Sequence, residues 1–414
     1  MFFWILKRVQ DDGSDILIFL NNNIMVILDR HLEIKSKYFM VIINHINSNG
    51  GKARLIGGVV RDSLLGIISS DIDIATDFIP DQVTKILTSA NIKVIPTGIK
   101  FGTVTAIIKD ESFEITTLRK DIDCDGRYAS VDYSDDFAED AARRDFTINA
   151  LSYCPIKERI YDYFGGIKDL EEKKVVFIGD AAKRVQEDYL RILRFFRFSA
   201  RYAKEIDPVG LDICIKYKGR LMSLSKERIK SEIDGLLLSA NAPEILKVMS
   251  NASILSEILP VKSYDLALHL QALSMCKKFG VNPSLSLIYS MLFMHTENIT
   301  CSELIALKFS KSCANIIMKM HLLMGLQENQ ELLHSLKYIW LEEKSFVQYF
   351  VFSTLFVKDS RCIYDLYLEL LDKEVPMFPI TGDDILALGY RGSDVGRFLG
   401  YLKEKWVISD FKAK

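Results

Sequence analysis

The sequence predicts an α+β protein in which a small mixed sheet is followed by a long helical region, and two patterns support this prediction. Between residues 50 and 165, short runs rich in β-branched residues alternate with clusters of Gly, Pro or Asp, which is typical of strands and turns. From about Ala181 onward, apolar residues recur with a period of about 3.6 and few Gly or Pro interrupt them, which indicates helices. The 414 residues suffice for about two to four domains.

We expect the strands of the first region at residues 54–56, 71–75, 93–95, 102–108 and 113–117. Residues 1–34 match neither the strand-rich nor the helical pattern well, and we expect them to form an N-terminal extension. The helical region shows no repeat with a period of 20–50 residues, so it does not read as a solenoid.

The composition excludes several classes of protein. A net charge of −2 means that a nucleic-acid partner would have to bind at a local basic surface, because the chain has no global excess of positive charge. The seven cysteines are widely spaced and never form C-x-x-C, which argues against a disulfide framework or a zinc site and favours a cytoplasmic location. We expect no membrane span, because no apolar run reaches about 18 residues.

Two adjacent glycines, Gly57 and Gly58, follow the first expected strand and precede a predicted helix. Glycines at such a junction let backbone N–H groups approach a phosphate at the positive end of the helix dipole, and Arg61 would add a fixed charge on the first turn. Taken alone, this pattern is equally consistent with a purely structural turn.

The next expected strand alternates acidic and apolar residues. Asp71 and Asp73 should project from one face of the strand and Ile72 and Ile74 from the other. Two carboxylates on one face repel each other unless a cation lies between them, and Glu114 on a later strand could complete a set of oxygen ligands suited to Mg²⁺. The alternative is a solvent-facing edge strand, although Asp is a poor strand former.

A basic segment lies at the start of the helical region. From Ala181 to Lys204 there are seven basic and two acidic residues. On a helix, one arc of about 120° would carry Glu187, Arg191, Arg194, Arg197 and Arg201. The opposite arc would carry Tyr189, Ile192, Leu193 and Phe196. Arginines interleaved with Phe195 and Phe198 favour recognition of phosphates or base edges over a merely solvated face.

Several motifs occur in an order that resembles a known family. They are GGVVRD at 57–62 with Asp71 and Asp73, GIKFGTVT at 98–105, FEITTLR at 113–119, RRDFTINAL at 143–151, YDYFGGIKDL at 161–170 and EDYLRILRFFRF at 187–198. Together they resemble the nucleotidyltransferase superfamily that includes DNA polymerase β, and within it the class II tRNA nucleotidyltransferases (CCA-adding enzymes) and bacterial poly(A) polymerases. Weaker similarity extends the resemblance over roughly residues 35–410.

The resemblance implies an architecture of head, neck, body and tail. Residues 35–165 would form a polymerase-β-like catalytic head with a small mixed sheet, and residues 166–240 a helical neck that carries a nucleotide-reading helix. Residues 241–414 would form a helical body and tail that bind RNA. The implied partners are the tRNA 3′ end, CTP and ATP, and we expect no membrane and no obligate protein partner.

The resemblance also implies roles for individual residues. Asp71 and Asp73 would hold two Mg²⁺ ions, with Glu114 as the third catalytic carboxylate. Asp188 and Arg191 would read the Watson–Crick edge of the incoming nucleotide, and Glu187 would hold Arg191. Nucleotide-binding roles are implied for Gly57, Gly58, Arg61, Arg144, Arg194 and Arg197 at the triphosphate and for Asp145 and Asn149 at the ribose. For the last two, a helix cap and ordinary surface polarity are nearly equal alternatives.

Four functions remain open, of which we favour complete CCA addition to tRNA. Poly(A) polymerases share these motifs but often carry a strongly basic C-terminal extension, whereas this sequence stops at Lys414 soon after its last predicted helix. Enzymes that add only A tend to shorten the segment before the Arg-Arg-Asp motif, which here is long and contains Asp125-Gly126-Arg127. Tyr128-Ala129 replaces the Arg-Pro of many relatives in this specificity loop. A catalytically inactive RNA-binding module conflicts with the intact Asp pair.

Overall fold

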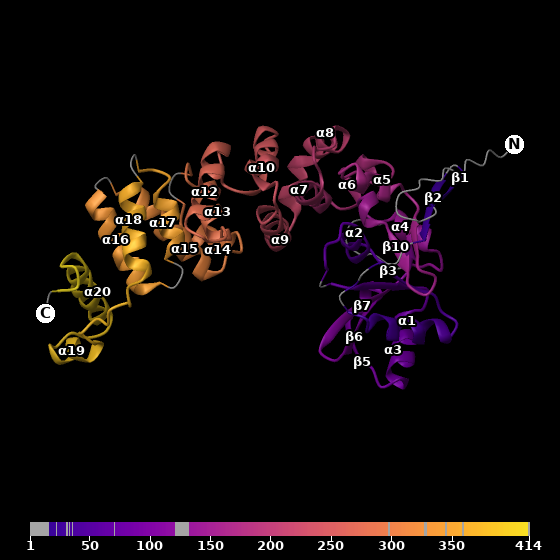
Figure 1. The fold of residues 1–414 in the computed structure, drawn as a ribbon, viewed down its shortest axis with the longest axis horizontal. Helices are drawn as coiled ribbons and strands as arrows, with labels where there is room; N and C mark the ends of the chain where they lie inside the picture. Colours follow the sequence, from indigo (N-terminus) through magenta and orange to yellow (C-terminus); the bar gives the residue numbers. More distant parts are fainter. Residues whose placement is uncertain are drawn as a thin grey trace. The chain divides into compact units, whose positions relative to one another are not determined.

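The chain divides into two compact units, Met1–Leu221 and Met222–Lys414, each described here by itself (Figure 1). The structure, a computed structural model, describes residues 16–21, 23–29, 32, 34, 36–69, 71–120, 132–296, 299–326, 329–343, 346–357 and 360–412. The specificity-loop residues 125–129 lie outside the described residues.

The first unit is built on a mixed sheet with the order β1-β2-β11-β10-β3-β4-β7-β6-β5. Its strands are β1 Ile16–Asn21, β2 Asn23–Asp29, β3 Ala53–Ile56, β4 Asp73–Thr76, β5 Lys93–Gly98, β6 Thr103–Ile108, β7 Glu111–Thr117, β10 Ser152–Cys154 and β11 Arg159–Asp162. β4 and β7 run parallel, and the other neighbouring strands run antiparallel. The five strands predicted from the sequence are thus present, with ends that differ by up to three residues. The strand expected at 71–75 begins only at Asp73, so Asp71 and Ile72 precede β4.

The sheet also includes part of the segment that we expected to be an N-terminal extension. β1 and β2 form an antiparallel hairpin, and β2 pairs with β11. The signal was present in the sequence as two β-rich apolar runs, at 16–20 and 24–28, separated by asparagines. Residues 16–21 and 23–29 therefore belong to the sheet.

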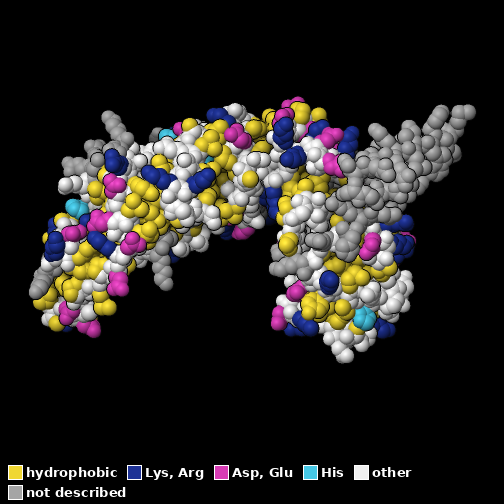
Figure 2. All heavy atoms as spheres, viewed as in Figure 1, with side chains coloured by type: hydrophobic (Ala, Val, Ile, Leu, Met, Phe, Trp, Pro, Cys, Tyr) yellow, Lys and Arg dark blue, Asp and Glu magenta, His cyan; other side chains and the backbone are white. Residues whose placement is uncertain are grey.

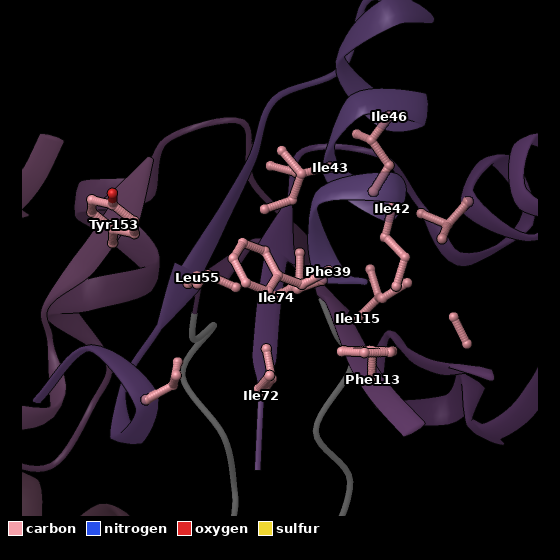
Figure 3. Packing of buried hydrophobic residues seen from close by; sticks show 14 of the residues in the cluster. Phe39, Ile42, Ile43, Ile46, Leu55, Ile72, Ile74, Phe113, Ile115 and Tyr153 are labelled. Atoms are coloured by element: carbon pink, nitrogen blue, oxygen red, sulfur yellow. The ribbon is translucent and has the colours of Figure 1, made fainter. Parts of the chain in front are cut away.

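One face of the sheet is covered by helices α1 (Phe39–Ser48) and α3 (Pro80–Ser89). Figure 3 shows Ile42 and Ile43 of α1 packed with Leu55 of β3, Ile74 of β4 and Ile115 of β7, all of them 0–1% exposed. Burial of side chains of this size stabilises a fold by roughly 1.5–3 kcal/mol each. Because β4 turns Ile74 into this core, its neighbour Asp73 projects to the opposite face of the sheet.

Further helices complete the first unit: α2 Gly58–Leu64, α4 Phe137–Ala142, α5 Gly166–Glu171, α6 Ala181–Glu187, α7 Leu190–Tyr202 and α8 Pro208–Tyr217. α7 packs through aromatic rings, since Phe195 and Phe198 approach Phe177 and Phe146 with ring centroids 5.4 Å apart in each pair. Phe195 and Phe198 are 0% and 8% exposed. The sequence had suggested that these rings alternate with the arginines on an exposed face of the helix. They instead form the core beneath the helix.

The basic segment forms two helices where the sequence analysis placed one. α6 ends at Glu187, Asp188 takes extended backbone angles (φ −153°, ψ 107°), and α7 begins at Leu190. The Asp188 carboxylate accepts a hydrogen bond from the Leu190 N–H at 3.0 Å. Short acidic side chains favour such bonds to nearby backbone over a helix interior, which explains the break.

The second unit consists of helices, as predicted for this region. They are α9 Lys226–Leu237, α10 Ala242–Asn251, α11 Leu255–Ile258, α12 Leu266–Lys278, α13 Leu285–Leu292, α14 Cys301–Ala306, α15 Lys311–Met324, α16 Asn329–Glu342, α17 Val347–Ser353, α18 Arg361–Leu371, α19 Gly382–Ala387 and α20 Ser393–Ile408. Figure 2 shows charges of both signs scattered among hydrophobic side chains on the visible face of this unit. In the described part of the chain, no helix has the length and apolar character needed to cross a membrane.

Candidate active site

The glycine turn at the start of α2 has a conformation that requires glycine. Gly57 has φ +67°, and its N–H donates to the Leu151 carbonyl at 3.0 Å. A Cβ atom on Gly57 would lie 3.0 Å from Nη1 of Arg144. A side chain at this position would thus be strained by its backbone angle and crowded by the guanidinium. The turn brings Arg144 against the end of β3.

The three carboxylates predicted from the sequence lie near one another. β4 and β7 are neighbours in the sheet, and Asp73 lies directly opposite Glu114 in their register. Burial raises the pKa of Asp73 to about 6, with further upward contributions from Glu114 and Asp71, while Arg144 acts in the opposite direction. Asp73 and Glu114 interact because β4 and β7 lie side by side in the sheet, whereas Asp71 acts on Asp73 from two residues away in the chain.

This donor set suits a small divalent cation. Among the residues that the structure describes, no group of three or more His, Cys, Asp or Glu is arranged to hold a metal ion. Asp71 and Asp73 instead form a pair of carboxylates whose mutual repulsion a cation would relieve. Mg²⁺ in nucleotide sites is typically held by one or two carboxylates together with substrate phosphates, so the pair fits this ion.

Asp140 is a buried residue that the sequence analysis did not select. Its carboxylate, 3% exposed, accepts hydrogen bonds from Arg143 Nη2 at 2.6 Å and from Arg144 Nη2 at 3.1 Å. Burial alone would raise the pKa of Asp140, but the charges of both arginines and their hydrogen bonds outweigh burial and lower it. Its position three and four residues before the arginines on a helical segment was the available sequence signal.

A chain of buried polar side chains joins α2 to α7. Arg194 Nε donates to Asp145 Oδ2 at 2.6 Å, Asn149 Nδ2 donates to Asp145 Oδ1 at 2.9 Å, and Arg61 Nη1 donates to Asn149 Oδ1. Arg61, Asp145 and Asn149 are each only 6–7% exposed. Asn149 is therefore not an ordinary surface polar residue, and the predicted nucleotide-binding residues on the two helices are connected to each other.

Arg191 is held in one orientation by three acceptors. Its Nη1 donates to Glu187 Oε2 at 2.6 Å and to the Arg184 carbonyl at 3.0 Å, and its Nη2 donates to the Arg143 carbonyl at 3.0 Å. Among the described residues, none accepts a hydrogen bond from its Nε or from the second hydrogen of its Nη2. A planar guanidinium fixed in this way is pre-oriented to donate to a further group.

The remaining arginines of α7 lie along its partly exposed stripe. Arg194 and Arg197 are half-buried, and their guanidinium carbons lie 5.2 Å and 4.7 Å from the centroid of the Phe198 ring. All the remaining side chains from Ile192 to Ala200 are buried. The helix thus divides as its sequence period predicts, with a packed face and an arginine face.

Comparisons with known proteins agree with this architecture. The model of the poly A polymerase head domain matches residues 53–176. The mitochondrial CCA tRNA nucleotidyltransferase 1 of Homo sapiens is 32% identical over 372 residues, which cover 87% of this chain and 83% of the relative. The corresponding protein of Danio rerio is 31% identical, covering 88% and 85%. The CCA-adding enzyme of Bacillus subtilis (strain 168) is 34% identical over 50% of this chain and 52% of its own length.

Solved structures share the fold. The Bacillus stearothermophilus CCA-adding enzyme in complex with CTP superposes with a TM-score of 0.68 at 24% identity, covering 90% of this chain and 92% of its own. The Thermotoga maritima CCA-adding enzyme complexed with tRNA gives a TM-score of 0.65 at 18% identity, covering 91% of both chains. With the similarity to the human relative extending over most of both sequences, the chain belongs to the CCA tRNA nucleotidyltransferase family.

Proposed function

We propose that the protein adds CCA to the 3′ ends of tRNA from CTP and ATP, with release of pyrophosphate. The observation that carries the proposal is the placement of the adjacent residues Arg143 and Arg144. Arg144 acts electrostatically on Asp73, and the carbonyl of Arg143 accepts a hydrogen bond from Arg191. Two consecutive residues therefore link the carboxylates to the arginine that would read the base. Similarity over most of both sequences to a CCA tRNA nucleotidyltransferase supports the same substrate.

The family generally uses divalent metal ions, and we infer that two Mg²⁺ ions are held by Asp71 and Asp73. When bound, such ions lower the pKa of an attacking 3′-hydroxyl and neutralise the triphosphate. Asp71 and Asp73 would supply the carboxylate oxygens, and Glu114 would sit beside them as the third catalytic carboxylate. Arg61, Arg144, Arg194 and Arg197, near the glycine turn and on α7, would bind the phosphates.

Base selection follows from the fixed orientation of Arg191. Cytosine and adenine both carry an exocyclic amino group beside a ring acceptor, whereas uracil and guanine present the opposite pattern. The Asp188 carboxylate would accept from the amino group, and the remaining donors of Arg191 would bond the ring nitrogen. Glu187, 2.6 Å from Arg191, would keep the guanidinium in the orientation that this pairing requires. Asp145 and Asn149 would lie toward the ribose.

We further propose that residues 166–240 act as the neck between the catalytic head at 35–165 and an RNA-binding body and tail at 241–414. A tRNA presents a duplex arm and a single-stranded end, so the helices would recognise shape and backbone rather than base sequence. We expect tRNA binding by this protein to weaken steeply as the salt concentration rises, because contacts to the RNA backbone are electrostatic. Equal affinity of the isolated 3′-terminal trinucleotide and whole tRNA would contradict this division of labour.

Incubation of the protein with tRNA lacking its terminal CCA, Mg²⁺ and single labelled nucleotides tests the proposal. Addition of three residues followed by arrest is the expected result. An open-ended ladder with ATP would identify a poly(A) polymerase, the second candidate because the matched head-domain model bears that description. Addition of CC alone or A alone would identify a split-function enzyme, and no addition an inactive RNA-binding module.

Asp71→Ala and Asp73→Ala test the metal assignment. Each variant should abolish incorporation while tRNA affinity stays within about twofold, because the carboxylates would serve chemistry and not RNA docking. Asp135→Asn is a matched control, since Asp135 is an exposed acidic residue of the same unit. Substantial incorporation by either alanine variant would refute the assignment.

We propose a cytoplasmic location on the basis of the thiols. The structure leaves Cys154, Cys214, Cys276, Cys301, Cys313 and Cys362 as free cysteines. Free thiols are typical of reducing compartments. The relatives from Homo sapiens and Danio rerio are named as mitochondrial, so fractionation of cells that express the full chain should separate the two compartments, and recovery in mitochondria would refute the proposal.

A further inference from the structure

Asp62 is a buried carboxylate on α2 that accepts hydrogen bonds from its neighbour Arg61 and from Arg201 and Tyr202 at the far end of α7. It is 4% exposed, and it accepts from Arg61 Nε at 2.8 Å, from Tyr202 Oη at 2.8 Å and from Arg201 Nη2 at 3.2 Å. A buried charge is strongly unfavourable unless such donors satisfy it. Asp62 thereby attaches the C-terminal end of α7 to the helix that follows the glycine turn.

The hydroxyl of Tyr202 is a permanent donor in this cluster. Burial raises the pKa of Tyr202 to about 12, although Arg61 acts in the opposite direction, while the charge of Asp62 and the hydrogen bond to it contribute further to the rise. The hydroxyl therefore keeps its proton throughout the physiological pH range. The Tyr202 ring also lies 4.3 Å from the guanidinium carbon of Arg61, so it contacts both members of the ion pair.

Asp62 and Asn149 together leave one nitrogen of Arg61 facing the glycine turn. Nε donates to Asp62 and Nη1 to Asn149, so the plane of the guanidinium is fixed at two of its three nitrogens. The third nitrogen, Nη2, lies 3.5 Å from the position that a Cβ atom of Gly58 would occupy. Arg61 thus presents Nη2 toward the backbone of the turn where a nucleotide phosphate is expected to bind.

α7 is attached to the head at two points on its length. Arg194 bonds Asp145 near one end, and Tyr202 and Arg201 bond Asp62 at the other. Eight residues separate Arg194 from Tyr202, a distance of about 12 Å along a helix. Two attachments so far apart oppose both sliding and rotation of the helix.

We propose that Asp62 is a positioning residue for nucleotide binding, which fixes Arg61 at the glycine turn and holds α7 so that arginines from both elements face one nucleotide. The inference rests on the proposed function, because it assumes that the nucleotide binds between these elements. Asp62 itself does not touch the nucleotide in this arrangement. Arg191 on α7 is held separately by Glu187 and by the carbonyls of Arg184 and Arg143, so loss of the Asp62 contacts should affect nucleotide affinity and not the choice of base.

The test is a kinetic comparison of wild type, Asp62→Asn and Tyr202→Phe, with tRNA lacking CCA as the acceptor for CTP and tRNA ending in CC as the acceptor for ATP. Asp62→Asn should raise KM for CTP and for ATP by the same factor, about tenfold or more, because a charge-assisted anchor of Arg61 is lost. The kcat should change by less than about threefold, and discrimination against UTP should persist. Tyr202→Phe keeps both charges and the ring, and should raise both KM values by about threefold.

A matched cluster in the second unit supplies the control. Asp234 accepts from Tyr289 Oη at 2.8 Å and from Lys230 Nζ at 2.6 Å. Asp234→Asn should lower the melting temperature and leave the nucleotide KM unchanged. Asp62→Asn or Tyr202→Phe with a lowered melting temperature and an unchanged nucleotide KM would overturn the positioning role.

The outcomes also separate this inference from the proposed function. If the wild-type protein adds no nucleotide to tRNA, the proposed function fails. If the wild type is active and both variants keep its KM, only the role of Asp62 fails. If Asp62→Asn does not fold, Tyr202→Phe alone decides, because it removes a single hydroxyl from the cluster.

Discussion

Asp73 combines a role in the proposed chemistry with an unfavourable environment for its charge. Burial, Glu114 and Asp71 together raise its pKa from 3.8 to about 6. Each pKa unit corresponds to about 1.4 kcal/mol, so the charged form destabilises the metal-free fold by at most roughly 3 kcal/mol above pH 6. Asp73→Asn removes this charge. The variant should therefore be inactive and yet more stable than the wild type when no metal is present.

The pH dependence has a definite sign. Between about pH 4 and pH 6 the folded state holds the Asp73 proton more tightly than the unfolded state, so the contribution of Asp73 to the free energy of unfolding falls as the pH rises. The Asn side chain of the variant does not take up or release a proton in this pH range. The advantage of Asp73→Asn should be near zero at pH 4 and about 1–3 kcal/mol at pH 8.

Urea unfolding of both proteins in EDTA, followed by circular dichroism at pH 4 and pH 8, measures this difference. Asp135→Asn, at an exposed acidic position, should show no comparable gain. Addition of Mg²⁺ at pH 8 should stabilise the wild type alone, and so reduce the difference in free energy of unfolding between the two proteins. A variant that is less stable than the wild type at pH 8 in EDTA, or a gap that does not depend on pH, would refute the reasoning.

Three further predictions concern separate parts of the molecule. Arg191→Ala should lower the ratio of kcat/KM for CTP over UTP by about 10- to 100-fold, and an unchanged ratio would refute its template role. Gly166→Ala should cost more than about 2 kcal/mol in thermal unfolding, because its Cβ would collide with the Thr147 carbonyl, and an unaltered melting temperature would contradict this. Burial lowers the pKa of His269 to about 4, so below about pH 6.5 the unfolded state binds a proton that the folded state does not. The free energy of unfolding should therefore fall by about 2 kcal/mol between pH 7 and pH 5. Urea unfolding of His269→Gln should show no such fall.

Much of the fold followed from short-range patterns. The alternation of Asp71, Ile72, Asp73 and Ile74 predicted a strand with buried isoleucines. Ile72 and Ile74 are indeed buried in the core, although the strand begins only at Asp73. Period-2 and period-3.6 patterns reflect which side of an element meets the core, so they are readable locally. The break at Asp188 was missed because its capping bond competes with a strong helical pattern on both sides.

The burial of polar residues could not be read in the same way. Arg61 and Asn149 were predicted as nucleotide contacts, and nothing in their immediate neighbours indicated that the two side chains would bond each other across 88 residues. Asp140 was passed over because an acidic residue on a helix is usually solvated. Its burial between Arg143 and Arg144 becomes visible only when the helix is packed in place.

The sequence by itself determined the five central strands of the sheet, the helical character of the second unit, the face on which Asp73 projects and the arginine stripe of α7. These features depend on residues a few positions apart. Only the tertiary structure decided that Asp73 would lie opposite Glu114, that Arg143 and Arg144 would join the carboxylates to Arg191, and that Asp62 would hold Tyr202. Such contacts join residues about 40 to 140 positions apart. They form only when the whole chain folds, because the burial of many side chains together must outweigh the loss of conformational entropy.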